Sequence, residues 1–225
     1  MITPTKIPTN CNGHSVLRSP NEIALALTGR PYISHSEVTT FQSCPLKWHF
    51  TYVEKAEPEQ VSAALLLGSC THAAIERHLE SHLLYEALPT LDQLMETYQQ
   101  NWQEEAKKVP LIQYAGNDDA QSVENTGRYM LEAYLGSPYA TPKGQIIGIE
   151  ENIHTTLATD IPDLVGRVDM LEYHQDELVI TDFKTTRSMW SPETAEEHAQ
   201  QLLLYAQATQ PLAEELKAKI RLQFI

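Results

Sequence analysis

The sequence contains few cysteines, and it has neither a long apolar run nor a low-complexity tract. Its three cysteines, Cys11, Cys44 and Cys70, include no close pair, which argues against a disulfide framework and against a self-contained metal knuckle. No run approaches the roughly 18 apolar residues of a membrane span, and the N-terminus lacks the charged-then-apolar layout of a secretion signal. These absences predict a cytoplasmic protein without a membrane partner.

Basic residues are also scarce relative to acidic ones. The 16 Lys and Arg residues face 30 Asp and Glu residues, which gives a formal net charge of −14 at pH 7. Phosphate binding usually draws on Lys and Arg, so this balance counts against tight non-specific DNA binding by this chain alone. It does not exclude a nucleic-acid enzyme, because bound divalent cations reverse the local charge at a site.

The order of patterns along the chain predicts one domain that follows a leader. Residues 1–31 are interpreted as a flexible N-terminal leader, and residues 32–225 as the domain. Helices are expected from a capping box at Ser34 to Glu37, from Pro45, and over residues 60–87, 91–108, 122–135 and 191–209, with a short one after Pro211. The helices between residues 88 and 140 would form an insertion. A strand pattern at 219–225 reaches the last residue, so we expect the natural domain to continue further.

Two aliphatic and β-branched runs flank a polar turn at residues 174–177, which is a hairpin signature. The turn lacks the Asn-Gly or Asp-Gly of the strongest hairpins. If the turn is centred at its middle, Asp169 lies directly opposite Asp182, with the Cβ atoms about 4.5–5.5 Å apart, and Lys184 joins them on the same face. Two carboxylates held so close repel each other unless a cation lies between them. The hairpin therefore predicts a metal ion.

A helical segment adds a histidine to these acids. His72 follows Gly68 by four residues and precedes Glu76 by four, so the three share one helical face. Taken alone, His72 is more simply a polar surface residue. However, a glycine inside a helix costs about 1 kcal/mol relative to alanine, which indicates that another group approaches closely there. Imidazole is a common ligand of transition metals, and Glu76 would orient His72 or hold a water molecule behind it.

The strand that carries Asp182 and Lys184 is otherwise apolar, and charges there are costly unless they are paired or bound to a metal. A plain ion pair between the lysine and the acids is one interpretation. The functional interpretation is that Lys184 positions the attacking water or neutralises charge in the transition state. Gln201 and Tyr205 are i, i+4 neighbours that form either an ordinary surface pair or a substrate-side pair that also fixes Lys184.

Together these motifs closely resemble the PD-(D/E)XK nuclease superfamily and, within it, the RecB-type nuclease domain and its AddB-like exonuclease branch. The resemblance covers about residues 32–225 and includes the entry segment Ser34 to Pro45. It implies an α/β, restriction-endonuclease-like core, in which helices flank a mixed central β-sheet. The implied roles are metal ligation by His72, Asp169, Asp182 and the backbone carbonyl of Phe183, catalysis by Lys184 with the two acids, and substrate binding by Gln201 and Tyr205.

Some relatives in this branch bind a 4Fe–4S cluster through a cysteine at the position of Cys44 and three later cysteines. No cysteine follows Cys70 here, so no iron–sulfur cluster is expected from this chain alone. Either the chain belongs to the cluster-free members, or the partner cysteines lie in sequence beyond Ile225. We expect Cys44 to be a packed core thiol.

The resemblance implies a Mg²⁺- or Mn²⁺-dependent deoxyribonuclease that acts as an exonuclease on single-stranded DNA or duplex ends. The setting would be repair, recombination or phage DNA processing, with a helicase or another recombination protein as partner; this step is analogy alone. The alternative is a catalytically inactive nucleic-acid or protein-binding module on the same fold. A hydrolase that acts on another phosphate ester is a third interpretation. Metal titration separates the first two, and a substrate comparison tests the third.

Overall fold

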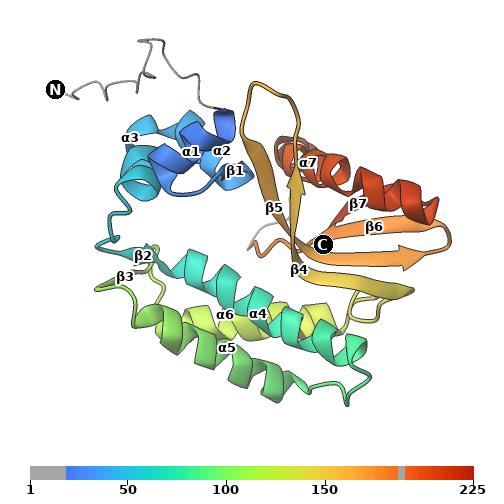
Figure 1. The fold of residues 1–225 in the computed structure, drawn as a ribbon. Helices are drawn as coiled ribbons and strands as arrows, with labels where there is room; N and C mark the ends of the chain where they lie inside the picture. The colour runs from blue at the N-terminus through green and yellow to red at the C-terminus, as the bar shows by residue number, and fades with distance from the viewer. Residues whose placement is uncertain (1–18, 187–190) are drawn as a thin grey trace, which may run out of the picture. The chain divides into compact units, whose positions relative to one another are not determined.

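The computed structural model describes residues 19–186 and 191–225, which fall into two compact units (Figure 1). The first unit comprises Met1–Lys55, of which residues 19–55 are described, together with His154–Val165. The second comprises Ala56–Ile153 and Gly166–Ile225. The domain predicted over residues 32–225 therefore contains the whole second unit and most of the first.

The first unit consists of short helices and one parallel strand pair. Its elements are α1 (Pro20–Thr28), β1 (Tyr32–Ser34), α2 (His35–Ser43), α3 (Pro45–Trp48) and the π-helix η1 (His49–Val53). Strand β1 pairs in parallel with the first residues of β5 (Asp163–His174). As predicted, Pro45 begins a helix at its first position, with Cys44 as the N-cap.

The flexible leader predicted over residues 1–31 is wrong for the part that forms α1. Ser19 and Glu22 form a reciprocal capping box, Pro20 occupies the first turn, and Gly29 ends the helix in a left-handed conformation. Asn21 then anchors the helix, because its side chain donates to the Asp163 carboxylate at 2.8 Å and accepts from the Asp163 backbone N–H. Residues 1–18 lie outside the described residues.

The capping box predicted at Ser34 is only half formed. The Ser34 hydroxyl accepts a hydrogen bond from the Glu37 backbone N–H at 3.2 Å. The Glu37 side chain does not return to the cap. Its carboxylate is buried and instead accepts from the Arg30 guanidinium at 2.8 Å and from Trp48 Nε1 at 3.2 Å. A buried charge requires such partners, and this need outweighs the local capping contact.

The second unit contains the longer helices and most of the sheet. Its elements are β2 (Val61–Ser62), α4 (Ala63–Leu83), α5 (Leu91–Ala106), β3 (Ile112–Gln113), α6 (Ala120–Leu135), most of β4 (Gln145–Thr155) and of β5, β6 (Glu177–Asp182), α7 (Pro192–Leu216) and β7 (Lys219–Phe224). The helices and strands predicted for this part of the chain are present with ends that shift by a few residues, except that the two helices predicted on either side of Pro211 are one continuous helix.

The predicted hairpin between β5 and β6 is confirmed. Its antiparallel register runs from His174↔Glu177 to Met170↔Thr181, and Asp169 and Asp182 are the next residues along the two strands. The turn residues Gln175 and Asp176 both have positive φ angles, 51° and 60°. Two left-handed residues give the turn a twist that suits the strands, although neither residue is glycine.

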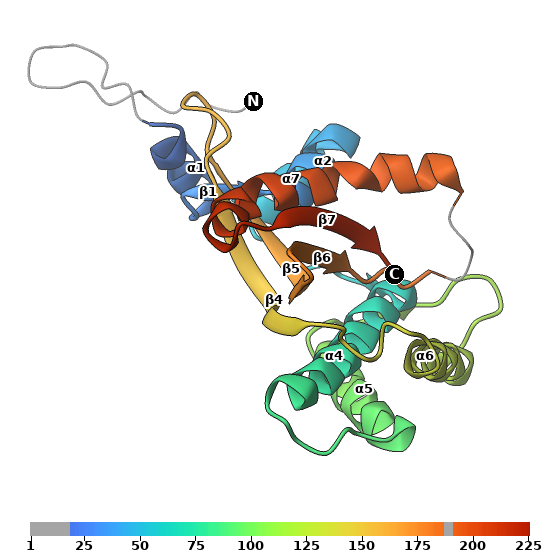
Figure 2. The ribbon, with the colours of Figure 1, turned by 90° about the vertical axis from the view of Figure 1, so that its right-hand side faces the viewer.

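Helices cover both faces of the sheet in the second unit. Strand β7 extends the hairpin in parallel beside β6, and β4 pairs with β5. In Figure 2, α7 lies on one side of the sheet and α4, α5 and α6 lie on the other. Leu171 and Ile180 pack with Leu202 and Tyr205 of α7, whereas Met170 and Phe183 pack with the group formed by α4, α5 and α6. The fold is mixed α/β, as predicted, and is consistent with a restriction-endonuclease-like core.

Helix α7 is longer than the sequence predicted. We expected a break before Pro211, but the helix continues through this residue to Leu216. The buried side chains Leu202, Tyr205, Thr209 and Ala213 recur every three or four residues on both sides of the proline. Burial of this continuous face offsets the roughly 3 kcal/mol that a proline costs inside a helix. In the described parts of the chain, neither α7 nor any other helix is long and apolar enough to cross a membrane.

Candidate metal centre

The two hairpin acids lie at the end of the sheet in the second unit. Asp182 is the last residue of β6 and is 2% exposed, and Asp169 on the neighbouring strand β5 is 9% exposed. The backbone N–H of Phe183 donates to Asp169 Oδ2 at 2.6 Å, which fixes one carboxylate oxygen. Phe183 itself is anchored by its buried ring, which meets Tyr134 edge-on at 5.8 Å. The core therefore holds the site rigidly from behind.

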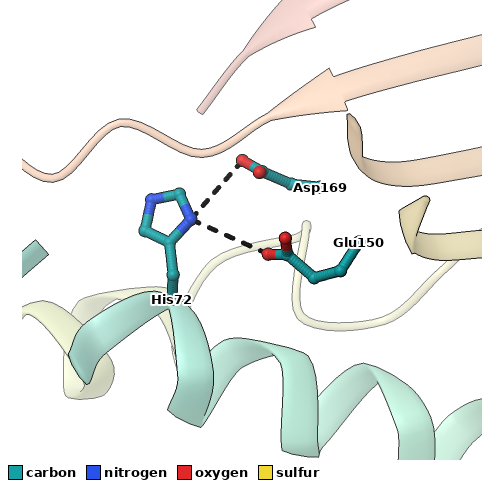
Figure 3. A group of neighbouring side chains, drawn as sticks. All are labelled: His72, Glu150 and Asp169. Carbon is teal, nitrogen blue, oxygen red and sulfur yellow. Dashed lines mark ion pairs between the residues drawn. The ribbon is translucent and has the colours of Figure 1, made fainter. Parts of the chain in front are cut away.

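His72 reaches the same place from α4. Its Nδ1 lies 3.6 Å from Asp169 Oδ2 and 4.0 Å from Glu150 Oε1 (Figure 3). The potential ligand atoms of these three residues all lie within 4.8 Å of one another. Burial alone would lower the pKa of His72, but the hydrogen bond and charge of Asp169, together with Glu150 and Asp182, raise it above its ordinary value. The imidazole therefore sits in a strongly negative environment.

Glu150 is the site residue that sequence reasoning missed. It lies in β4 with a positive φ of 53°, and this conformation interrupts the strand's alternation. Ile146 and Gly148, at two-residue spacing before it, are both buried. This spacing could have revealed Glu150, because residues at positions 146, 148 and 150 of a strand share one face, and the first two of them are buried. Arg167 then holds the carboxylate, with Nε 2.5 Å from Glu150 Oε2.

The carboxylates of Glu150, Asp169 and Asp182 lie close together and are largely shielded from water, so they repel one another. Burial raises the pKa of Glu150 to about 7; the charge of Asp169 adds to this rise, and Arg167 opposes it. Burial also raises the pKa of Asp182, against the opposing effect of Lys184. A divalent cation would relieve this accumulated charge, and one imidazole with carboxylate oxygens is a donor set that suits such ions. The residues present therefore fit a metal ion.

Asp182 is not part of the three-residue cluster and is instead paired with Lys184. The ammonium lies 2.5 Å from Asp182 Oδ2 and donates to Gln201 Oε1 at 3.0 Å. Gln201 in turn donates through Nε2 to the Tyr205 hydroxyl at 2.5 Å. The ion pair considered as an alternative is thus present in the structure. It orients the lysine at the edge of the site.

Tyr205 of α7 is buried in the core behind Gln201. Its side chain is 3% exposed and packs in the core between the sheet and α7. A Cβ atom on Gly166 would come within 2.4 Å of the tyrosine ring, so only glycine leaves room for it. The predicted contact of Gln201 and Tyr205 with substrate stays a prediction. The other expected role, that Gln201 and Tyr205 fix Lys184, is supported by the hydrogen bonds from Lys184 to Gln201 and from Gln201 to Tyr205.

An open groove of about 540 Å³ leads along α4 to the cluster. The residues of interest along it are Gly68, His72, Glu76, Glu150, Arg167 and Thr185. The predicted close approach at Gly68 is present, because a Cβ atom there would lie 3.0 Å from Thr185 Oγ1. Burial raises the pKa of Glu76, which Arg167 opposes and Glu80 and Asp169 reinforce.

A family model of the PD-(D/E)XK nuclease superfamily matches residues 32–225. The chain belongs to this superfamily. No curated protein sequence matches it significantly. PD-(D/E)XK nucleases use divalent metal ions and act on nucleic acids, so the acidic cluster at His72, Glu150 and Asp169 is a possible metal site of such a nuclease.

Proposed function

We propose that this chain is a Mg²⁺- or Mn²⁺-dependent deoxyribonuclease whose centre is formed by His72, Glu150, Asp169 and Asp182. The observation that carries the proposal is the convergence of an imidazole and two carboxylates within 4.8 Å, beside a buried acid–lysine pair. Neither feature alone indicates a nuclease, since ion pairs are common. Their conjunction at the end of one hairpin, in a chain of this superfamily, is what favours hydrolysis of phosphodiester bonds.

The residues divide into those that would hold the ion and those that would act on the phosphate. His72, Glu150, Asp169 and Asp182 would supply ligands, as would the predicted backbone carbonyl of Phe183. When bound, the ion supplies Lewis acidity and makes a water molecule a stronger nucleophile. Lys184 would donate to the charge that develops on the phosphate, held in position by Gln201.

Further details of the activity extend the same proposal. An exonuclease in DNA repair, recombination or phage DNA processing, in the cytoplasm and of the RecB type, is the setting that the sequence motifs favour. Glu76, four residues along α4 from His72 and on the groove, would hold water or orient the imidazole. A helicase partner stays a prediction from analogy.

The direct test is cleavage of end-labelled single-stranded DNA, duplex DNA and RNA with Mg²⁺, Mn²⁺ or excess EDTA. We expect cleavage of a DNA substrate that depends on the ion, is abolished by EDTA, and is lost in Asp169→Asn. Undiminished activity in EDTA would exclude the mechanism. A protein that binds DNA but neither binds Mn²⁺ nor cleaves would be the inactive binding module instead.

A further inference from the structure

We infer that Arg167 is a substrate-binding residue that grips a backbone phosphate of the nucleic acid in the groove while it positions Glu150. This inference rests on the proposed nuclease function and names a residue that would hold the substrate beside the metal site. Arg167 precedes Asp169 by two residues on β5, so both side chains lie on the same side of the strand. One strand thus presents a cation and a metal-site acid together.

The charge of the groove makes this arginine unusual. The residues that line the groove include the acids Glu76 and Glu150, and Arg167 is the one Lys or Arg among them. Asp169 adds a further negative charge at the end of the groove. A polyanionic substrate entering here meets repulsion from every charged group of the wall except this guanidinium and the site's own cations. Arg167 is therefore the side chain of this groove that is best suited to bind a phosphate.

The contacts of the guanidinium leave it free to take that role. Its Nε lies 2.5 Å from Glu150 Oε2, and the side chain remains 60% exposed. Within the described parts of the chain, Glu150 is its one ion-pair partner. Because a guanidinium carries five N–H groups in a planar fork, engagement of Nε leaves the two terminal nitrogens able to donate to phosphate oxygens.

The same contact explains why the arginine also affects the metal site. Arg167 binds Oε2 of Glu150, while the other oxygen, Oε1, faces His72 Nδ1 at 4.0 Å. Fixing one oxygen orients the other toward the cluster. A phosphate held on the terminal nitrogens would then lie beside the site, so that binding of the substrate and of the ion are organised by one side chain.

The test compares Arg167→Gln and Arg167→Lys with wild type and with Arg128→Gln. Arg128 is a matched control, because it is also a half-exposed arginine paired with one acid, Asp92, and does not line the groove. Cleavage of the best DNA substrate gives KM and kcat. Fluorescence anisotropy with Ca²⁺ in place of Mg²⁺ gives DNA affinity across salt concentrations, and calorimetry gives Mn²⁺ affinity without DNA.

We expect Arg167→Gln to weaken DNA affinity and raise KM by about 10- to 100-fold, the range of a lost charged hydrogen bond. The slope of log affinity against log salt should fall by about 0.7–0.9, as for one lost phosphate contact. Arg167→Lys should restore the slope but only part of the affinity, and Arg128→Gln should match wild type. An unchanged salt slope with weakened Mn²⁺ binding would overturn the inference and leave Arg167 as a support for Glu150 alone. Wild type that neither binds nor cleaves DNA would instead refute the proposed function.

Discussion

The Lys184 ammonium donates to the side-chain oxygen of Gln201 at 3.0 Å, so α7 sets the direction of a lysine that extends from the sheet. The same ammonium contacts Asp182 at 2.5 Å and lies 5.6 Å from the centre of the Phe224 ring. An otherwise flexible side chain is thereby held on three sides. Preorganisation of this kind is what electrostatic stabilisation of a transition state requires.

Lys184→Ala should therefore lose turnover while it keeps the metal ion. Removal of one preorganised electrostatic group typically costs about 2.7–4 kcal/mol of transition-state stabilisation, a hundredfold or more in rate. Affinity for Mn²⁺ should stay the same or rise slightly, because the substitution removes the positive charge that is paired with Asp182. Single-turnover cleavage and calorimetry measure the two quantities, with Asp182→Asn, expected to lose both, run alongside. A wild-type rate in Lys184→Ala would make the lysine a structural ion-pair partner.

Glu150→Gln tests the acid that the fold adds to the predicted set. The substitution keeps the shape of the side chain but removes the charge that faces His72, so we expect Mn²⁺ affinity to fall at least tenfold and cleavage to fall with it. Glu151→Gln is the control, because the neighbouring carboxylate is exposed on β4 and is not part of the cluster. Equal Mn²⁺ affinity in both variants would remove Glu150 from the centre.

Gly166→Ala should disturb the position of Lys184 indirectly, through Tyr205 and Gln201. An added methyl group would meet the Tyr205 ring at 2.4 Å, and such overpacking typically costs about 1–3 kcal/mol. The displaced ring would carry the Gln201 contact with it, so cleavage should also decline. Urea unfolding and cleavage rates check both effects. Gly136→Ala, where the nearest atom is 3.4 Å away, should stay close to wild type. Unchanged stability and rate in Gly166→Ala would contradict the idea that this packing holds the lysine.

His78 should make the stability of the fold sensitive to acid. Burial, and to a lesser extent the neighbouring His82, lowers the pKa of His78 to about 4, and its Nδ1 lies 3.1 Å from the Tyr134 hydroxyl. Between pH 6.5 and about pH 4, His78 is protonated in the unfolded chain but neutral in the folded chain. This residue's contribution to stability therefore decreases as the pH falls from 6.5 to about 4, by roughly 3 kcal/mol at most.

The measurement is the free energy of unfolding in urea at pH 7 and at pH 5. His78→Gln, which can still hydrogen-bond to Tyr134, should reduce the difference between the two values. The half-exposed His49, replaced by glutamine, controls for the loss of a histidine as such. If His78→Gln retains the full pH dependence, the acid sensitivity arises at other groups.

The sequence was sufficient to predict three of the four side chains that we propose for the metal centre. The hairpin could be predicted because strand periodicity and a polar turn fix the register of the two strands, and that register brings Asp169 and Asp182 to the same end of the hairpin. For His72, helical spacing gave only the face that it shares with Gly68 and Glu76, and its role as a ligand came from the family resemblance. Glu150 was missed although the spacing of Ile146 and Gly148 points to it, because its role depends on residues that are distant in the sequence. Its partners lie on α4 and β5, and no local rule joins these elements.

The incorrect predictions at α1 and α7 have different causes. At α1 the signal was present, since Ser19, Pro20 and Glu22 form a typical helix start, but the composition of the surrounding residues suggested a flexible segment. At α7 the local rule about Pro211 was sound and was outweighed by packing. The first error is one of interpretation, whereas the second needed knowledge of the tertiary fold.

The two-residue turn of the hairpin also constrains how this protein can evolve. Gln175 and Asp176 close the loop with no residue to spare. Insertion or deletion of one codon on either side of the loop would shift the strand pairing by one position. Side chains alternate between faces, so Asp182 would then point away from its partner acid. A change in the length of this turn should therefore be more damaging to the site than a substitution within it.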